Sequence, residues 1–252
     1  PVRNIDSPDQ VKALIEDLQS FSAEPMLIAI DQEGGQIRRL KEVFGFPPTQ
    51  SAQYLGTMND LSLTREHATA MAQTLGRLGI NLNLAPVVDL NTNPENPIIG
   101  RYESSFSADP AIVTAHALEF IRAHHKQGIR CTLKHFPGHG SSAEDSHLGL
   151  VDVTTSWSRT ELVPYANIIQ AGEADAIMTA HVFNAKLDSD YPATLSKSTI
   201  TGILREELGY DGVVISDDMQ MGAIVNEYGI ETAIQAAIEA GIDIIAMANN
   251  ST

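Results

Sequence analysis

A carboxylate at the end of a short apolar run is the first feature of the chain that could do chemistry. Residues 212–219 read GVVISDDM, which places Asp217 and Asp218 directly after the run. The backbone ladder holds a side chain at the end of a buried strand rigidly, as a nucleophile or a metal ligand requires. We therefore predict that Asp217 acts chemically. The alternative is that one of these aspartates only caps the following turn.

A second candidate is the segment KHFPGHG at residues 134–140. Its proline and glycines preclude a helix, so His135 and His139 cannot share one helical face as the ligands of a zinc protease do. We interpret Lys134 and His135, at the end of another apolar run, as hydrogen-bond donors to substrate oxygens. A metal-dependent hydrolase that uses His135, His139 and Asp217 is the alternative, and the ligand spacing does not favour it.

Asp145 and His147 stand two residues apart in the polar stretch that follows. A carboxylate in this position can orient an imidazole and stabilise its protonated form. Such a histidine can act first as a general acid and then as a general base. The alternative is that both side chains are simply solvated.

A third candidate is DQEGGQIRR at residues 31–39, where Asp31 again follows an apolar run. The two glycines allow a sharp turn or a close approach of the backbone to a ligand. Neither GxGxxG nor GxxxxGK[ST] occurs in the chain, so the usual signatures of nucleotide cofactors are missing. Arg38 and Arg39 are either ligand contacts or surface charges.

Six helical patterns alternate with six short apolar runs and would position these side chains. Nearly continuous hydrophobicity indicates strands that are covered on both faces, as in a parallel sheet, and the alternation predicts an α/β fold. At the fourth helix, Glu161 is expected to complete a capping box with Ser158. The predicted helices are 7–20, 62–79, 109–128, 158–172, 197–208 and 229–240, and the predicted strands are 26–30, 82–88, 129–133, 176–180, 212–215 and 242–247.

Polar groups at the ends of five of the six runs favour a closed (β/α)8 TIM-type barrel over an open sheet. In an open sheet ligand groups gather at one switch point, whereas in a barrel nearly every strand contributes one. We predict that residues 1–252 form a single barrel domain, with one strand before Met26 and one after Met247 missing or disguised. The strand-end groups are Asp31, Asp89, Lys134 with His135, His181, and Asp217 with Asp218.

Composition excludes several classes of protein. The chain has 252 residues, of which 43% are hydrophobic and 19% charged, and its formal net charge is -16. This profile is typical of a folded soluble domain, and the charge argues against nucleic acid as a partner. No apolar stretch approaches the roughly 20 residues of a membrane span. The single cysteine, Cys131, excludes an internal disulfide and is expected to be a buried structural thiol.

No targeting segment is visible in the sequence. The chain begins with Pro1 and ends just after an apolar run, so we expect both ends to be trimmed. The net charge is compatible with a cytoplasmic or an exported bacterial protein.

Taken together and in this order, the segments resemble glycoside hydrolase family 3, and within it the β-N-acetylhexosaminidase branch. The string KHFPGHG is the most specific part of the match, which spans almost the whole chain. The resemblance implies a barrel domain and a retaining glycosidase that removes terminal β-linked N-acetylglucosamine, with peptidoglycan fragments as a candidate source. The matching segments are 31–35, 84–89, 97–100, 134–140, 145–147 and 216–219.

The resemblance also implies roles for individual residues. Asp217 matches the nucleophile that forms a glycosyl-enzyme intermediate. His147 matches the general acid/base, and Asp145 matches its partner. No metal or organic cofactor is implied, because two side chains supply the nucleophile and the acid/base.

Other positions match substrate-binding residues of the family. The sugar-binding matches are Asp31, Arg39, Lys134 and His135, and His181 matches a further pocket-lining position. The branch usually has an arginine directly before a Ser-Phe pair, but Ser104 stands there in this chain. Arg101, three residues earlier, is the expected substitute in substrate binding.

Three rival functions remain open besides the metal-dependent hydrolase. The Asp145-Ser-His147 segment counts against a β-glucosidase of the same family, because those members usually take their acid/base from a different place. A phosphorylase that acts on N-acetylglucosaminides could use the same residues, since a histidine acid/base does not repel phosphate. An inactive sugar-binding barrel would be expected to lack the nucleophile or the dyad formed by Asp145 and His147.

Overall fold

The computed structural model describes residues 4–248, and residues 1–3 and 249–252 lie outside the described part. Five parallel strands form the main sheet in the order β1-β4-β5-β7-β9, so each new strand of this sheet is added beside the previous one. The register pairs Ala29 with Leu82 and Ile177 with Val214. The strands are β1 (Ala29–Ile30), β4 (Leu82–Asn83), β5 (Arg130–Phe136), β7 (Ala176–Thr179) and β9 (Val213–Ile215).

Five of the six predicted strands are therefore confirmed, although most are shorter than predicted. The sixth run, 242–247, contributes one isolated parallel bridge between Ile215 and Ile244. Among the described residues no strand is paired with the outer edge of β1. The α/β class with a parallel sheet is confirmed. The region after Met247, where a further strand was expected to be missing or disguised, lies outside the described residues apart from Ala248.

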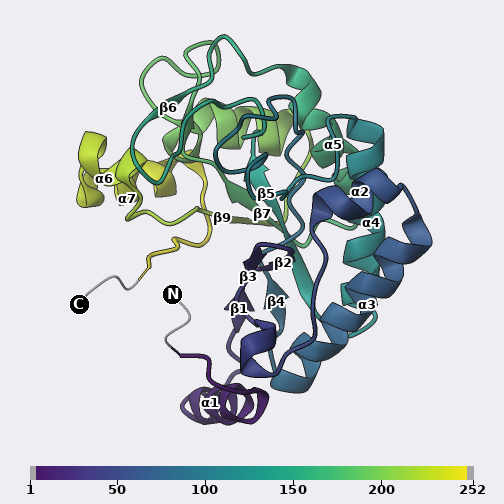
Figure 1. The fold of residues 1–252 in the computed structure, drawn as a ribbon. Coiled ribbons are helices and arrows are strands. Elements are labelled where there is room, and N and C mark those ends of the chain that lie inside the picture. Colours follow the sequence, from purple (N-terminus) through teal and green to yellow (C-terminus); the bar gives the residue numbers. More distant parts are fainter. Residues whose placement is uncertain (1–3, 249–252) are drawn as a thin grey trace.

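All six predicted helices are present, and most lie outside the sheet (Figure 1). The cap predicted at Ser7 is formed, because its hydroxyl accepts the N–H of Gln10. On α3 the buried Ala68, Ala72 and Leu75 form the apolar stripe of an amphipathic helix. The helices are α1 (Pro8–Ser20), α3 (Leu61–Leu78), α4 (Pro110–His125), η2 (Arg159–Leu162) continued by α5 (Val163–Gln170), the π-helical η4 (Ser198–Glu207), and α7 (Ile230–Ala240).

Several short elements were not predicted. They include a hairpin directly after β1, and a helix directly after Asp217 and its turn. Their small size explains the omission, since strands and 3-10 turns of two or three residues carry no periodicity and helices of seven residues carry little. They are β2 (Gln32–Gly34) and β3 (Ile37–Arg38), η1 (Glu42–Phe44), α2 (Ala52–Met58), β6 (Val151–Asp152) and β8 (Val182–Phe183), η3 (Ala193–Leu195) and α6 (Gly222–Tyr228).

The predicted capping box at residue 158 is wrong. Ser158 makes no side-chain cap, and the Glu161 side chain is turned inward with 2% of the residue exposed. One of its oxygens accepts the backbone N–H of Gly140 at 3.2 Å. A tertiary contact has therefore replaced the local one. Burial raises the pKa of Glu161 to about 7.

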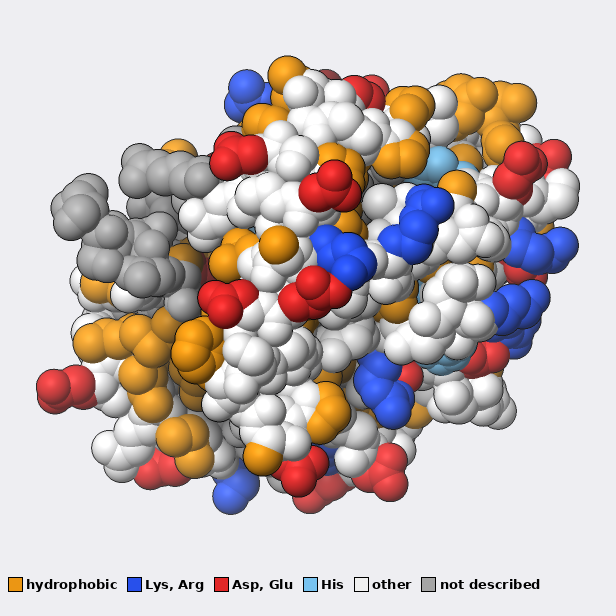
Figure 2. Space-filling view, turned by 90° about the horizontal axis from the view of Figure 1, so that it is seen from below, with side chains coloured by type: hydrophobic (Ala, Val, Ile, Leu, Met, Phe, Trp, Pro, Cys, Tyr) orange, Lys and Arg blue, Asp and Glu red, His pale blue; other side chains and the backbone are white. Residues whose placement is uncertain are grey.

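Two further expectations concern burial and charge. Cys131 lies in β5 with 1% exposure, and burial raises the pKa of its thiol, as expected of a structural cysteine. Among residues 4–248, no helix combines the length and the apolar character needed to cross a membrane. On the face in Figure 2, Lys and Arg side chains lie beside Asp and Glu side chains rather than in a separate basic patch.

Candidate active site

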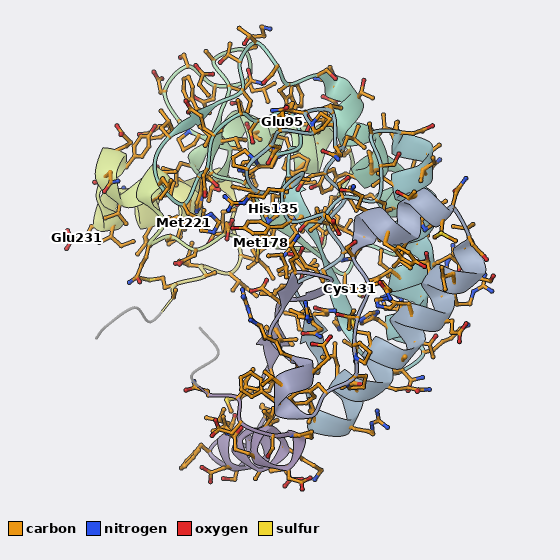
Figure 3. The ribbon with its side chains drawn as sticks, viewed as in Figure 1. Glu95, Cys131, His135, Met178, Met221 and Glu231 are labelled. Atoms are coloured by element: carbon orange, nitrogen blue, oxygen red, sulfur yellow. The ribbon has the colours of Figure 1, made fainter. Side chains whose placement is uncertain are left out.

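A cavity of about 450 Å³ gathers side chains that follow the strands of the sheet. Its walls come from the ends of β1, β5, β7 and β9 and from the loops after β4 and β5. Figure 3 shows His135 and Met178 near each other at the centre of the molecule, where β5 and β7 end, and both line the cavity. Seven of the nine predicted site residues line it as well: Asp31, Arg39, Lys134, His135, Asp145, His147 and Asp217.

Lys134 connects two carboxylates on one wall. Its Nζ lies 3.0 Å from Oδ1 of Asp31 and 2.8 Å from Oε1 of Glu33. Burial lowers the pKa of Lys134, but the two carboxylates outweigh burial and hold the pKa above its ordinary value. The ammonium group is therefore charged and fixed in place.

Arg39 completes this charged group from the strand β3 side. Its Nη2 lies 2.9 Å from Oδ2 of Asp31. Burial raises the pKa of Asp31, but Lys134 and Arg39 together hold it well below the usual carboxyl range. Two cations thus balance two carboxylates, which suits a polar but uncharged ligand that needs both donors and acceptors.

Two cavity residues were not predicted as substrate contacts: Glu33 was not singled out, and Ser104 was named only as the position of the missing arginine. The Ser104 hydroxyl donates to Oε2 of Glu33 at 2.8 Å, and both residues line the cavity. Arg101 does not line it: the guanidinium lies 5.7 Å from the centre of the Tyr102 ring, and the side chain is exposed. The structure therefore does not bring Arg101 to the place where the family's arginine is missing.

Asp89 holds His135 from behind the cavity wall. Its Oδ2 lies 2.8 Å from Nδ1 of His135, and the backbone N–H groups of His135 and His139 donate to the same carboxylate. Burial lowers the pKa of His135, but the bond to Asp89 and its charge outweigh this and raise the pKa above the ordinary value. The Nε2 atom of His135 makes no hydrogen bond to another described side chain and is available to a ligand.

Asp217 stands at the end of β9, as predicted. The N–H of Asp218 donates to its Oδ1 at 2.7 Å. Burial raises the pKa of Asp217, but the nearby His181, His135 and Lys134 outweigh burial and hold it below the ordinary carboxyl value. The carboxylate is therefore ionised near neutral pH, the state that a nucleophile needs.

His181 does not line the cavity, although it was predicted to do so on the family's pattern. It is fully buried, with Nδ1 2.8 Å from the Thr194 hydroxyl and Nε2 donating to the Asp218 carbonyl at 3.0 Å. Burial lowers its pKa, so the ring is neutral. His181 thus supports the turn that carries Asp217 rather than contacting the open space.

Asp145 and His147 form the predicted pair at the mouth of the cavity. Oδ1 of Asp145 lies 2.8 Å from Nδ1 of His147 and also accepts the His147 backbone N–H. The His147 side chain is 62% exposed. An exposed imidazole with one nitrogen held by a carboxylate can exchange protons through the other.

The geometry does not favour the metal alternative. Both ring nitrogens of His139 bond to serine hydroxyls, and His139 is not part of the cavity wall. Within residues 4–248, no group of three or more His, Cys, Asp or Glu side chains could hold a metal ion. The arrangement instead offers an ionised carboxylate, an imidazole–carboxylate pair and a polar pocket. A glycosidase or a glycosyl transferring enzyme would use this set of groups.

Comparison with known families identifies the family of the chain. The family model described as the glycosyl hydrolase family 3 N terminal domain matches residues 1–252. The chain belongs to glycosyl hydrolase family 3. The resemblance seen in the motifs is thereby confirmed.

Relatives of the chain include proteins named beta-hexosaminidase. Proteins called beta-hexosaminidase from Tolumonas auensis and Xylella fastidiosa are 37% and 40% identical to the chain. The alignments cover 98% and 96% of the chain, and 74% and 73% of those proteins.

Solved structures of the family share the fold. A family 3 β-N-acetylglucosaminidase from a Paenibacillus species has a TM-score of 0.92 and 41% identity, and the match covers 98% of the chain but 47% of that protein. A β-N-acetylhexosaminidase from Beutenbergia cavernae has a TM-score of 0.91 and 32% identity, with 98% and 76% covered. The chain thus spans about half of one relative and about three quarters of the other.

Proposed function

We propose that the chain is a β-N-acetylhexosaminidase that removes terminal β-linked N-acetylglucosamine from carbohydrates by a retaining mechanism. The enzyme class rests on the family membership and on the relatives named beta-hexosaminidase. The residue roles rest on one observation, which is that Asp217 and the Asp145–His147 pair line the same cavity.

In the first step, Asp217 attacks the anomeric carbon and forms a glycosyl-enzyme ester. The bond between that carbon and the glycosidic oxygen breaks, and protonated His147 gives its proton to the departing oxygen. Asp145, with Oδ1 2.8 Å from Nδ1 of His147, orients the ring for this transfer.

In the second step, neutral His147 removes a proton from water as the water oxygen attacks the anomeric carbon. The ester bond to Asp217 breaks, and the carboxylate is restored. A carboxyl pair in a retaining glycosidase stands about 5 to 5.5 Å apart. A loop that delivers an imidazole relaxes that requirement, because the loop can move with the substrate.

Sugar hydroxyls would be bound by the charged wall. Asp31 accepts hydrogen bonds from them, and Lys134, Arg39 and His135 donate to others. The wall is balanced in charge, which suits a neutral sugar better than an anionic one.

We also propose that residues 1–252 belong to one (β/α)8 barrel domain. The five parallel strands follow one another in chain order, and the bridge to Ile244 adds a sixth position after β9. This succession is typical of a barrel wall, whereas a doubly wound sheet reverses its strand order at a switch point.

The first test is release of nitrophenol from nitrophenyl β-N-acetylglucosaminide and from the matching β-glucoside, with and without phosphate. Turnover of the acetamido sugar that falls in both Asp217→Ala and His147→Ala supports the proposal. Preference for the glucoside contradicts the specificity, and acceleration by phosphate indicates a phosphorylase. Binding of the sugar without turnover by the folded chain indicates a sugar-binding protein.

A further inference from the structure

Ser146 stands between the two members of the dyad but faces the opposite way. The residue is 2% exposed, whereas the neighbouring His147 side chain is 62% exposed. Its hydroxyl lies 3.1 Å from Nε2 of His139, a buried imidazole on the loop that follows β5. The segment that carries the dyad is thus tied to the protein interior through one side chain.

The hydrogen-bond partners of Ser142 determine how this contact is made. The Ser142 hydroxyl donates to the His139 carbonyl at 3.0 Å and accepts from Nδ2 of Asn96 at 2.9 Å. Its contact with Nδ1 of His139, at 2.7 Å, must therefore use the N–H of the ring. A neutral imidazole has one donor and one acceptor, so Nε2 accepts the proton of the Ser146 hydroxyl.

His139 itself is held rigidly. Its backbone N–H donates to Oδ1 of Asp89 at 2.8 Å, and its carbonyl accepts from Nδ2 of Asn96 at 2.8 Å. Asp89 is the same carboxylate that orients His135 in the cavity wall. A continuous set of hydrogen bonds therefore runs from the proposed sugar-binding wall through His139 to residues 145–147, the dyad loop.

The dyad loop has few other anchors. The N–H groups of Gly222 and Ala223 donate to the carbonyls of His147 and Ser146, at 3.2 and 3.3 Å. Leu148, directly after the dyad, is 79% exposed and contributes little burial. A loop with so little packing depends strongly on each buried polar contact that it makes.

We propose that His139 and Ser146 are positioning residues that hold the Asp145–His147 dyad over the cavity, so that His147 can protonate the leaving group. This inference rests on the proposed function. The inference separates the roles of His135 and His139, the two histidines of the KHFPGHG motif. His135 lines the cavity, whereas His139 does not and acts only through the segment that carries Asp145 and His147.

The test measures kcat/KM of Ser146→Ala for two aryl β-N-acetylglucosaminides, one with a dinitrophenyl and one with a phenyl leaving group. The dinitrophenolate ion leaves without help, whereas the phenyl ether oxygen needs a proton from the acid. We expect the loss on the phenyl substrate to exceed the loss on the dinitrophenyl substrate by about tenfold, since general acid catalysis contributes roughly 10²- to 10⁴-fold.

Three further variants separate loss of the His139–Ser146 contact from simple damage to the fold. Ser196→Ala removes another buried serine hydroxyl, bonded to Ser198 and to the Thr199 N–H, far from the dyad in the chain. It should affect both substrates equally. His139→Gln places an amide oxygen near the former Nε2 and should restore part of the phenyl rate, whereas His139→Leu should not.

Equal losses on the two substrates in Ser146→Ala, matching those of Ser196→Ala, would overturn the inference. His147→Ala is measured in parallel. If His147→Ala is itself insensitive to the leaving group, the proposed acid role is wrong and the inference falls with it. If only His147→Ala is sensitive, the acid role stands and the inference alone fails.

Discussion

Asp89 and His135 form a buried carboxylate–imidazole pair, with Oδ2 2.8 Å from Nδ1, and the Asp89 side chain is fully shielded from solvent. The pair couples the cavity wall to the backbone of the loop after β5, because Asp89 also accepts the N–H of His139. The orientation of the His135 imidazole in the cavity wall thus depends on a buried residue that does not itself line the cavity.

This pair predicts a specific pH dependence of stability. Asp89 has a lowered pKa, so its contribution is present above 3.8 and is lost as the pH falls through the folded-state value. His135 has a raised pKa, so its contribution is present below 6.5 and is lost as the pH rises through the folded-state value.

We therefore expect Asp89→Asn to reduce the free energy of unfolding most between pH 3.8 and pH 6.5, and less at alkaline pH. Urea denaturation at about pH 5 and about pH 9 measures the difference. A gap between the two proteins that widens towards alkaline pH would contradict the assignment of an ion pair.

Asp217→Gly tests the nucleophile by stereochemistry as well as by rate. We expect kcat to fall by about 10³-fold or more, since nucleophile variants in other enzymes lose this much. Added azide should restore turnover and give the α-glycosyl azide, because the anion attacks from the face that the carboxylate occupied. His147→Gly is the matched comparison, since its glycosyl-enzyme would be attacked from the opposite face and give the β-glycosyl azide. A β product from Asp217→Gly would reject the assignment.

Lys134→Met tests the charged wall. The lysine side chain is 4% exposed and contacts both Asp31 and Glu33, so its removal leaves two partly buried carboxylates without their shared partner. Breaking such a pair costs about 3 kcal/mol of unfolding free energy. Urea denaturation should show this loss, and adding Glu33→Gln should recover part of it. Unchanged stability in Lys134→Met would show that the carboxylates are well solvated.

Glu161→Gln should stabilise the protein at alkaline pH. Burial raises the pKa of Glu161 to about 7 from 4.5, so the folded state loses stability as the pH rises from 4.5 through about 7. Glutamine resembles the protonated acid, and its amide oxygen can still accept the Gly140 N–H. The variant should gain about 2 to 3 kcal/mol over the natural chain at about pH 8 and little at about pH 4. Thermal melting at both values checks this, and equal shifts would contradict it.

The sequence by itself determined the α/β class, the position of the main strands and most of the charged and titratable side chains of the cavity. Polar side chains directly after apolar runs, such as Asp31 and Asp217, lie at one place because parallel strands all end at the same edge of the sheet. The pairing of Asp145 with His147 was also predictable, since a spacing of two residues keeps them close whatever the rest of the fold does.

Only the tertiary structure decided which of the remaining polar residues work together. Glu33 meets Ser104, Glu161 meets Gly140, and His139 meets Ser146 because separate loops pack against one another. Their burial removes water as a partner, so each group must bond to whatever polar atom the packing brings near. Local pattern contains no record of those neighbours, which is why the capping box at Ser158 was mispredicted and the inward direction of His139 was not foreseen.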